Sequence, residues 1–70
     1  SYNEQREFDG MEEAILVAEE KVEALQAESN DPELANHHER MTTVWADLAA
    51  AQSEVERLYA RWSELEGKQG

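Results

Sequence analysis

The residues best suited to chemistry stand near the middle of the chain, where Glu33 precedes His37 by one helical turn and His38 and Glu39 follow it. Imidazole nitrogens and carboxylate oxygens are common ligands of zinc, and a closed structural site needs four ligands. Adjacent residues of a helix point about 100° apart, so neighbouring histidines do not converge on one ion. The chain has no third histidine and no cysteine. We therefore expect no metal site, and we expect His37 to form a polar end of the core.

Two pairs of adjacent carboxylates, Glu12-Glu13 and Glu19-Glu20, are a second place to look for acid–base chemistry. Such chemistry needs carboxyl groups whose pKa values are shifted by burial or by charged neighbours in a pocket. A pair of helices offers these residues an exposed face instead. The sequence also contains no glycine-rich phosphate loop, nucleophile elbow or zinc-ligand spacing. We expect no catalytic residues, no cofactor-binding residues and no enzyme activity in this chain.

Two ladders of apolar residues at alternating steps of three and four predict the elements that carry these side chains. That spacing keeps one stripe of a helix facing a partner, as in coiled coils. Asn30-Asp31-Pro32 separates the ladders and breaks the helix. The sequence predicts an all-α fold, namely an antiparallel two-helix coiled-coil hairpin that forms a single domain over residues 1–70. We expect this hairpin to be a monomer. The ladders are Phe8, Met11, Ile15, Ala18, Val22 and Leu25, then Leu34, Met41, Val44, Leu48, Ala51, Val55, Leu58, Trp62 and Leu65, with His37 interrupting the second.

Capping residues predict where the helices begin. An acid three positions after a capping side chain can complete a capping box, and a proline is favoured in the first turn of a helix. Asp31-Pro32 has the second pattern. The candidate boxes are Ser1 with Glu4, Asp9 with Glu12 and Asn36 with Glu39. We expect a short helix over residues 2–8, long helices over 10–29 and 37–66, a tip over 30–36, and an end marked by Gly67 and Gly70.

The facing positions of the two ladders also predict a register. In the favoured register Val22 lies opposite Val44 and Leu25 opposite Met41. The same register pairs Lys21 with Asp47 and Glu28 with Arg40.

At the base of the hairpin this register sets Trp62 against Glu4, and burying a carboxylate there is costly. We therefore expect the first helix to change phase at Asp9-Gly10, so that a short N-terminal helical segment packs against the base. The expected aromatic clamp consists of Tyr2, Phe8, Tyr59 and Trp62.

The charge of the chain bears on its partners. Seventeen acidic and six basic residues give a formal net charge of −11. Ten of the acids lie in residues 1–31, so the first helix is the more acidic arm. Nucleic-acid affinity comes largely from Lys and Arg, and this charge opposes binding to phosphate backbones and anionic membranes. The longest apolar run is also far shorter than the roughly 20 residues that a membrane span needs.

Among the apolar residues off the ladders, three are candidates for contact with a partner. Leu16 and Val17 form a small patch beside Ile15, and Trp45 flanks the second ladder, near Glu19 in the favoured register. Packing along the helix flanks would account for them, and so would contact with another domain or a second copy of the chain. With the basic pair Arg57 and Arg61 as the candidate contact for nucleic acid, the predicted interaction surface is Leu16, Val17, Trp45, Arg57 and Arg61.

The two ends of the chain are the most specific parts of the sequence. Three stretches carry this specificity: the opening Ser1-Tyr2-Asn3-Glu4-Gln5-Arg6-Glu7, the tip Asp31-Pro32, and the ending Leu58-Tyr59-Ala60-Arg61-Trp62-Ser63-Glu64-Leu65-Glu66. Together they resemble the C-terminal coiled-coil domain of ABC-F ATPases, especially the Uup-like branch. The likeness covers nearly the whole chain. Tyr2, Gln5 and Arg6 match the family's opening, and Tyr59 and Trp62 match its ending.

The resemblance implies a longer cytoplasmic parent with two ATP-binding cassettes, which would hold ATP and Mg²⁺, and no transmembrane domain. ABC-F proteins generally act on ribosomes, so the resemblance implies that the hairpin contacts the cassettes of its own chain and also a ribosome or another protein. In some members the hairpin is basic and associated with DNA or RNA. The second helix here carries only Arg40, Arg57, Arg61 and Lys68 among acids. We therefore expect a protein-contacting or ribosome-contacting arm, with nucleic-acid binding and homodimerisation as the alternatives.

Overall fold

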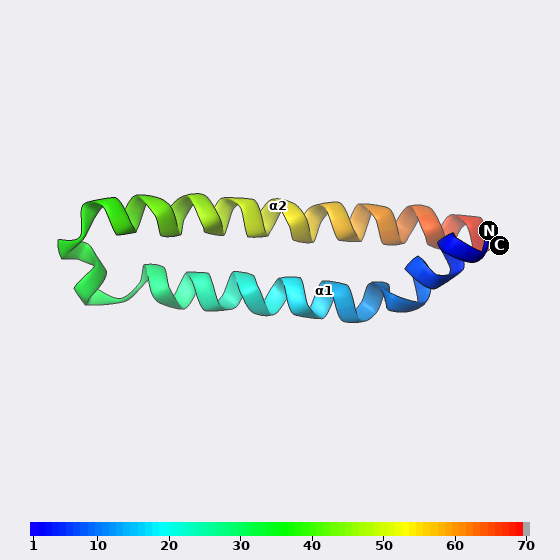
Figure 1. Cartoon of the computed structure of the whole chain (residues 1–70), viewed down its shortest axis with the longest axis horizontal. Helices are drawn as coiled ribbons and strands as arrows, with labels where there is room; N and C mark the ends of the chain where they lie inside the picture. Colours follow the sequence, from blue (N-terminus) through cyan, green and yellow to red (C-terminus); the bar gives the residue numbers. More distant parts are fainter. Residues whose placement is uncertain (70) are drawn as a thin grey trace.

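The computed structural model describes residues 1–69, which form two long helices joined by a short 3-10 helix. Helix α1 spans Tyr2–Ser29, the 3-10 helix η1 spans Pro32–Asn36, and helix α2 spans His38–Gln69. The two α-helices run antiparallel, and η1 closes the tip, while the beginning of α1 and the end of α2 lie together at the base (Figure 1). The rod measures 52 × 15 × 15 Å. The predicted all-α hairpin is confirmed.

Two of the predicted helix starts are confirmed. The Ser1 hydroxyl oxygen accepts a hydrogen bond from the Glu4 backbone N–H at 3.2 Å, and the Glu4 side chain completes the capping box. At the tip, Asp31 Oδ1 accepts from the Glu33 backbone N–H at 3.0 Å, with Pro32 in the first turn of η1. Each cap satisfies a backbone donor that the first turn of its helix leaves free.

Three other predicted boundaries are wrong. Helix α1 is continuous through Asp9, whose carboxylate accepts from Gln5 Nε2 at 2.9 Å instead of capping a new helix. Asn36 belongs to η1, and α2 begins at His38. Helix α2 also continues through Gly67 to Gln69, because a glycine without a positive φ angle does not stop a helix. Gly70 lies outside the described residues.

Residues from both ladders form the core. Met11, Ile15, Leu58 and Leu65 make one buried cluster, against which Phe8, Ala18 and Trp62 pack. Leu34, Val44 and Ala51 are buried nearer the tip. The side chain of Leu65 is fully buried. The core is therefore a single seam between α1 and α2, as the ladders predict.

The predicted register is wrong by one heptad. Tyr59 Oη donates a hydrogen bond to Glu19 Oε2 at 3.1 Å. The predicted register sets Tyr59 opposite Glu7, and Glu19 lies twelve residues further along α1, or about 18 Å, which two side chains do not span. Sliding α1 by one heptad sets Tyr59 opposite Ala14, about 7.5 Å from Glu19 along the helix.

The shifted register explains the composition of the core. It sets Met11 opposite Trp62, Ile15 opposite Leu58 and Phe8 opposite Leu65, and all six belong to the cluster at the base. It also removes the contacts predicted for Val22 with Val44 and for Leu25 with Met41. Accordingly, neither Lys21 with Asp47 nor Glu28 with Arg40 is an ion pair among the described residues.

The tip accounts for the shift. Helix α2 extends beyond the end of α1, and η1 lies in the space this leaves (Figure 1). Leu34 of η1 is only 4% exposed, and η1 packs against α2. Because η1 covers the first turns of α2, α1 pairs with residues further along α2 than a tight turn would allow.

The base also differs from the prediction. Near its beginning, α1 changes direction and crosses toward the end of α2 (Figure 1), without the break expected at Asp9-Gly10. The helical segment at the base is therefore a bend within α1, and it directs Glu4 and Glu7 toward the last turns of α2.

Candidate interaction surface

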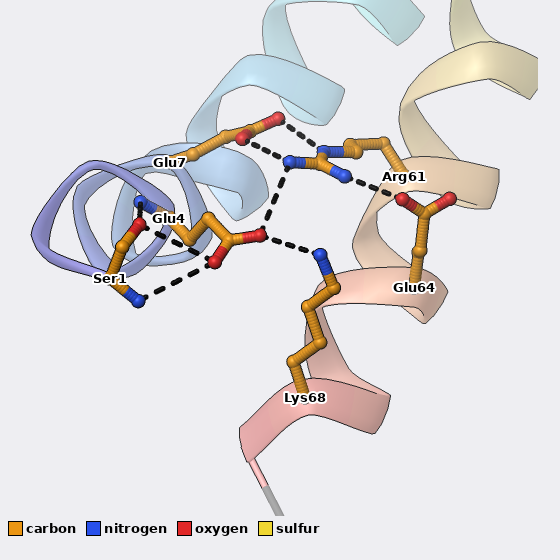
Figure 2. Close-up of polar contacts among 6 residues, drawn as sticks. All are labelled: Ser1, Glu4, Glu7, Arg61, Glu64 and Lys68. Atoms are coloured by element: carbon orange, nitrogen blue, oxygen red, sulfur yellow. Dashed lines mark hydrogen bonds and ion pairs between the residues drawn. The ribbon is translucent and has the colours of Figure 1, made fainter.

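At the base of the hairpin, an ion-pair network joins the first turns of α1 to the last turns of α2 (Figure 2). Arg61 Nε and Nη2 donate to the two carboxylate oxygens of Glu7 at 2.8 and 2.9 Å, and Arg61 Nη1 donates to Glu64 at 2.5 Å. Lys68 Nζ donates to Glu4 Oε2 at 2.6 Å, and Arg61 Nη2 lies 3.9 Å from the same oxygen. The bidentate pair of Arg61 with Glu7 is the most directional contact of the network.

The network shifts the pKa values of its members. The hydrogen bond and charge of Lys68 lower the pKa of Glu4 to about 2. The hydrogen bonds that Arg61 donates to Glu7 lower the pKa of Glu7 and raise the pKa of Arg61. These groups lie at the surface, where ion pairs contribute little individually, so the network orders the base more than it stabilises the fold.

Sequence reasoning missed this network. The signal was present, because two acids in the first turns of α1 face two bases in the last turns of α2. Arg61, predicted as part of an interaction surface, is instead bound to Glu7 and Glu64, with its side chain 27% exposed.

The predicted aromatic clamp is only partly assembled. Phe8 and Trp62 pack against the core cluster, and the ring centres of Tyr59 and Trp62 lie 6.4 Å apart. Tyr2 is wrong as a clamp residue, since it is 75% exposed and its ring lies 6.0 Å from the guanidinium carbon of Arg6. Tyr2 precedes Glu4 by two positions, which turns it about 200° away from the side that faces α2.

One flank of the hairpin carries a shallow groove. It is lined by the apolar side chains of Ile15, Leu16, Tyr59 and Trp62, which we call its floor. It is also lined by the carboxylates of Asp9, Glu12, Glu13 and Glu19, which we call its rim. We call these eight residues the acidic groove. The hydrogen bond from Tyr59 to Glu19 crosses it from α2 to α1 and raises the pKa of Tyr59.

Val17 lies on the other flank, in a hollow that also contains Lys21, Glu54 and Arg57. Leu16 and Val17 are adjacent, so they point about 100° apart and do not form the single patch that the sequence suggested. Arg57 Nε and Nη2 donate to Glu54 at 2.8 and 2.6 Å, which raises the pKa of Arg57 and lowers that of Glu54. This flank therefore carries both signs of charge.

Trp45 lies nearer the tip than both hollows. It is 63% exposed, and its Nε1–H donates to Met41 Sδ at 3.0 Å. The predicted proximity of Trp45 to Glu19 is wrong, because Glu19 pairs with Tyr59, fourteen residues or about 21 Å further along α2. The five residues predicted as one interaction surface thus occupy four separate places.

The residues considered for chemistry are all at the surface. Both histidines, Glu33 and Glu39 are exposed, and so are Glu12, Glu13, Glu19 and Glu20. Within residues 1–69, no three His, Cys, Asp or Glu side chains are grouped so as to hold a metal ion. In the same range, neither long helix is apolar enough over a sufficient length to cross a membrane.

Comparison with known proteins identifies the family. Residues 1–67 match the family described as ABC transporter C-terminal domain. The chain is 39% identical over 67 residues to the ATP-binding protein Uup of Escherichia coli, a match covering 94% of this chain and 11% of that protein. It is 36% identical over 69 residues to the ATP-binding protein Uup-like of Haemophilus influenzae, covering 97% of this chain and 15% of that protein. The Uup protein of Haemophilus influenzae is also 36% identical over 69 residues.

No solved structure gives a significant match to the chain. The chain corresponds to 11–15% of the length of the curated relatives it matches. The family match nevertheless covers almost every residue, including the base, where Arg61 of α2 pairs with Glu7 of α1. The chain therefore belongs to the ABC transporter C-terminal domain family and is homologous to part of the Uup ATP-binding proteins.

Proposed function

We propose that this hairpin is a non-catalytic accessory arm of a cytoplasmic ABC-F type ATP-binding protein, and that it makes contact with a protein, either on the ribosome or elsewhere. The observation that carries the proposal is the match of residues 1–67 to a C-terminal domain, in relatives that are named as ATP-binding proteins and are several times longer. ATP and Mg²⁺ would bind to cassettes in the remainder of such a protein, to which the hairpin would also be attached.

The shape of the chain supports a contact function. A rod of 52 × 15 × 15 Å offers long side faces and a tip, and the hollows on its surface are open grooves along the helices. Catalysis and tight binding of small molecules need a concave, water-excluding pocket. A rod of this shape can extend from the protein that carries it and contact a second protein.

The charge supports a protein contact over a nucleic-acid contact. The net charge is −11, and both arginines of the candidate nucleic-acid surface are bound to carboxylates, Arg57 to Glu54 and Arg61 to Glu7 and Glu64. Phosphate binding would have to displace those carboxylates. Basic protein surfaces, such as those of ribosomal proteins, complement this chain better.

A sedimentation experiment tests the proposal. The chain is mixed with purified ribosomes at about 150 mM salt, close to physiological ionic strength, and the expected result is saturable cosedimentation. The matched control is the chain carrying Ala14→Pro and Ala50→Pro, which breaks both helices and should abolish binding. ATP hydrolysis by the isolated chain, or binding to duplex DNA in place of ribosomes, would contradict the proposal.

A further inference from the structure

The acidic groove exposes apolar surface that the hairpin itself does not use. Leu16 is 56% exposed and Tyr59 45% exposed, and Trp62 beside them is only partly buried. Trp and Tyr are the side chains most enriched where proteins bind other proteins tightly, because they bury a large area with few rotatable bonds. The floor of the groove is thus suited to contact with apolar side chains.

The rim of the groove carries negative charge that the hairpin does not neutralise. Asp9 accepts a hydrogen bond from the neutral amide of Gln5, and Glu19 accepts one from the neutral hydroxyl of Tyr59. Every ion pair within residues 1–69 uses Glu4, Glu7, Glu54 or Glu64. The four rim carboxylates therefore lack a cationic partner in this part of the chain.

The opposite flank provides the contrast. The hollow around Val17 also has apolar side chains, but Lys21 and Arg57 lie beside its acids, and Glu54 is already paired with Arg57. Of these two hollows, the acidic groove is the one that combines exposed aromatic side chains with charged groups of a single sign. A partner that complements this combination would present both apolar and positively charged side chains.

We infer that the acidic groove binds a cationic amphipathic segment of a partner protein, in which apolar side chains contact Leu16 and Trp62 and Arg or Lys side chains meet the rim. A guanidinium group can pair with a carboxylate through two hydrogen bonds and can stack on the face of Tyr59 or Trp62. The inference rests on the proposed function and names the surface and the partner chemistry of the arm.

The groove sets the size of the probe. From Asp9 to Glu19 it extends over ten residues of α1, or about 15 Å, which matches about three turns of a bound helix. A suitable probe is a fluorescent synthetic peptide with Leu on one helical face and Arg on the other. Two comparison peptides separate its features, one with Gln in place of every Arg and one oligoarginine without Leu.

A pair of neighbouring substitutions tests the location. Leu16→Lys places a cation in the acidic groove, and Val17→Lys makes the same change in charge on the opposite flank, at a residue that is 58% exposed. Fluorescence anisotropy with the Leu/Arg peptide should show affinity about tenfold weaker for Leu16→Lys and nearly unchanged for Val17→Lys. Both comparison peptides should bind the unmodified chain more weakly than the Leu/Arg peptide does.

A second pair of substitutions tests the rim without changing shape. Glu12→Gln should weaken binding of the Leu/Arg peptide and reduce its salt dependence, whereas Glu20→Gln, at an exposed residue outside the groove, should change both less. Circular dichroism establishes that each variant remains helical. If Leu16→Lys does not fold, the Glu12 and Glu20 variants still decide the outcome.

Several results would overturn the inference. They are equal losses for Leu16→Lys and Val17→Lys, equal binding of oligoarginine and the Leu/Arg peptide, or no binding of any peptide. Sedimentation with ribosomes separates this failure from that of the proposed function. If the chain and its Leu16→Lys variant cosediment equally with ribosomes while no peptide binds, the proposed function is retained, but the acidic groove is not the binding site.

Discussion

At the scale of single residues, the two tryptophans provide a matched pair. Trp62 packs against the core cluster, whereas Trp45 is 63% exposed and contacts Met41. A fully buried aromatic costs roughly 3–5 kcal/mol when truncated, and for the half-buried Trp62 we expect Trp62→Ala to cost about 2 kcal/mol. Melting followed by circular dichroism should show a decrease of about 10 °C. Trp45→Ala is the control, and a loss as large as that of Trp62→Ala would contradict the packing described.

Glu4 gives a prediction on pH. Its pKa in the folded chain is lowered to about 2 by Lys68. A carboxyl group with a lowered pKa contributes stability that is present above its unfolded pKa of about 4.3 and is lost as the pH falls toward the folded value. The melting temperature of the unmodified chain should therefore exceed that of Glu4→Gln at pH 7, and the difference should shrink between about pH 4.5 and pH 2.

The comparison with Glu4→Gln is necessary because acid also neutralises the other carboxylates. Protonation relieves the repulsion within a chain of net charge −11 and can raise the melting temperature of both proteins. The difference between them isolates Glu4. A constant difference over this pH range would show that the contact of Glu4 with Lys68 does not depend on its charge.

At the scale of the helices, Gly10 is a weak point within α1. Apart from its own turn of helix, a Cβ atom added there would meet no atom within 4 Å, and the residue has no positive φ angle. Alanine favours a helix over glycine by about 1 kcal/mol, so Gly10→Ala should raise the melting temperature by about 4–8 °C. Gly67→Ala, in the last turns of α2, should raise it less. A lower melting temperature for Gly10→Ala would show that the bend of α1 needs glycine.

The helices could be predicted from the sequence, but their alignment could not. Alternating steps of three and four place Met11, Ile15 and Leu58 on buried stripes whatever the register, so the fold and most of the core follow from periodicity. A heptad pattern fits equally well after each slide of seven residues, and the choice depends on the tip. What decides it is the packing of η1, with its buried Leu34, against α2, and the ladder does not show that Leu34 belongs to a separate 3-10 helix.

The same ambiguity limited the prediction of the site. With α1 one heptad out of place, Glu19 was set near Trp45, and its contact with Tyr59 was missed. The exposure of Leu16 was evident from its position off the ladder. Its separation from Val17 and the four carboxylates on its own face of α1 follow from helical periodicity, whereas the approach of Tyr59 and Trp62 from α2 depends on the alignment of the helices.

At the scale of the whole molecule, charge predicts the response to nucleic acid. With a net charge of −11 and with Arg57 and Arg61 held by carboxylates, the chain should not bind duplex DNA measurably at about 150 mM salt. Fluorescence anisotropy with a labelled duplex, repeated at low salt, measures this. Submicromolar affinity near physiological salt, lost when Arg57→Glu and Arg61→Glu are combined, would contradict this prediction and favour the nucleic-acid alternative.

The position of the two described ends side by side at the base has a mechanical consequence (Figure 1). A force that pulls these ends apart acts across the seam and separates α1 from α2 layer by layer, beginning with the pairs of Lys68 with Glu4 and Arg61 with Glu7. Forced unfolding is governed by the barrier to breaking the contacts under load, and here only a few contacts are loaded at a time. The hairpin should thus open like a zipper under small forces, while remaining stiff to a load applied along its 52 Å length.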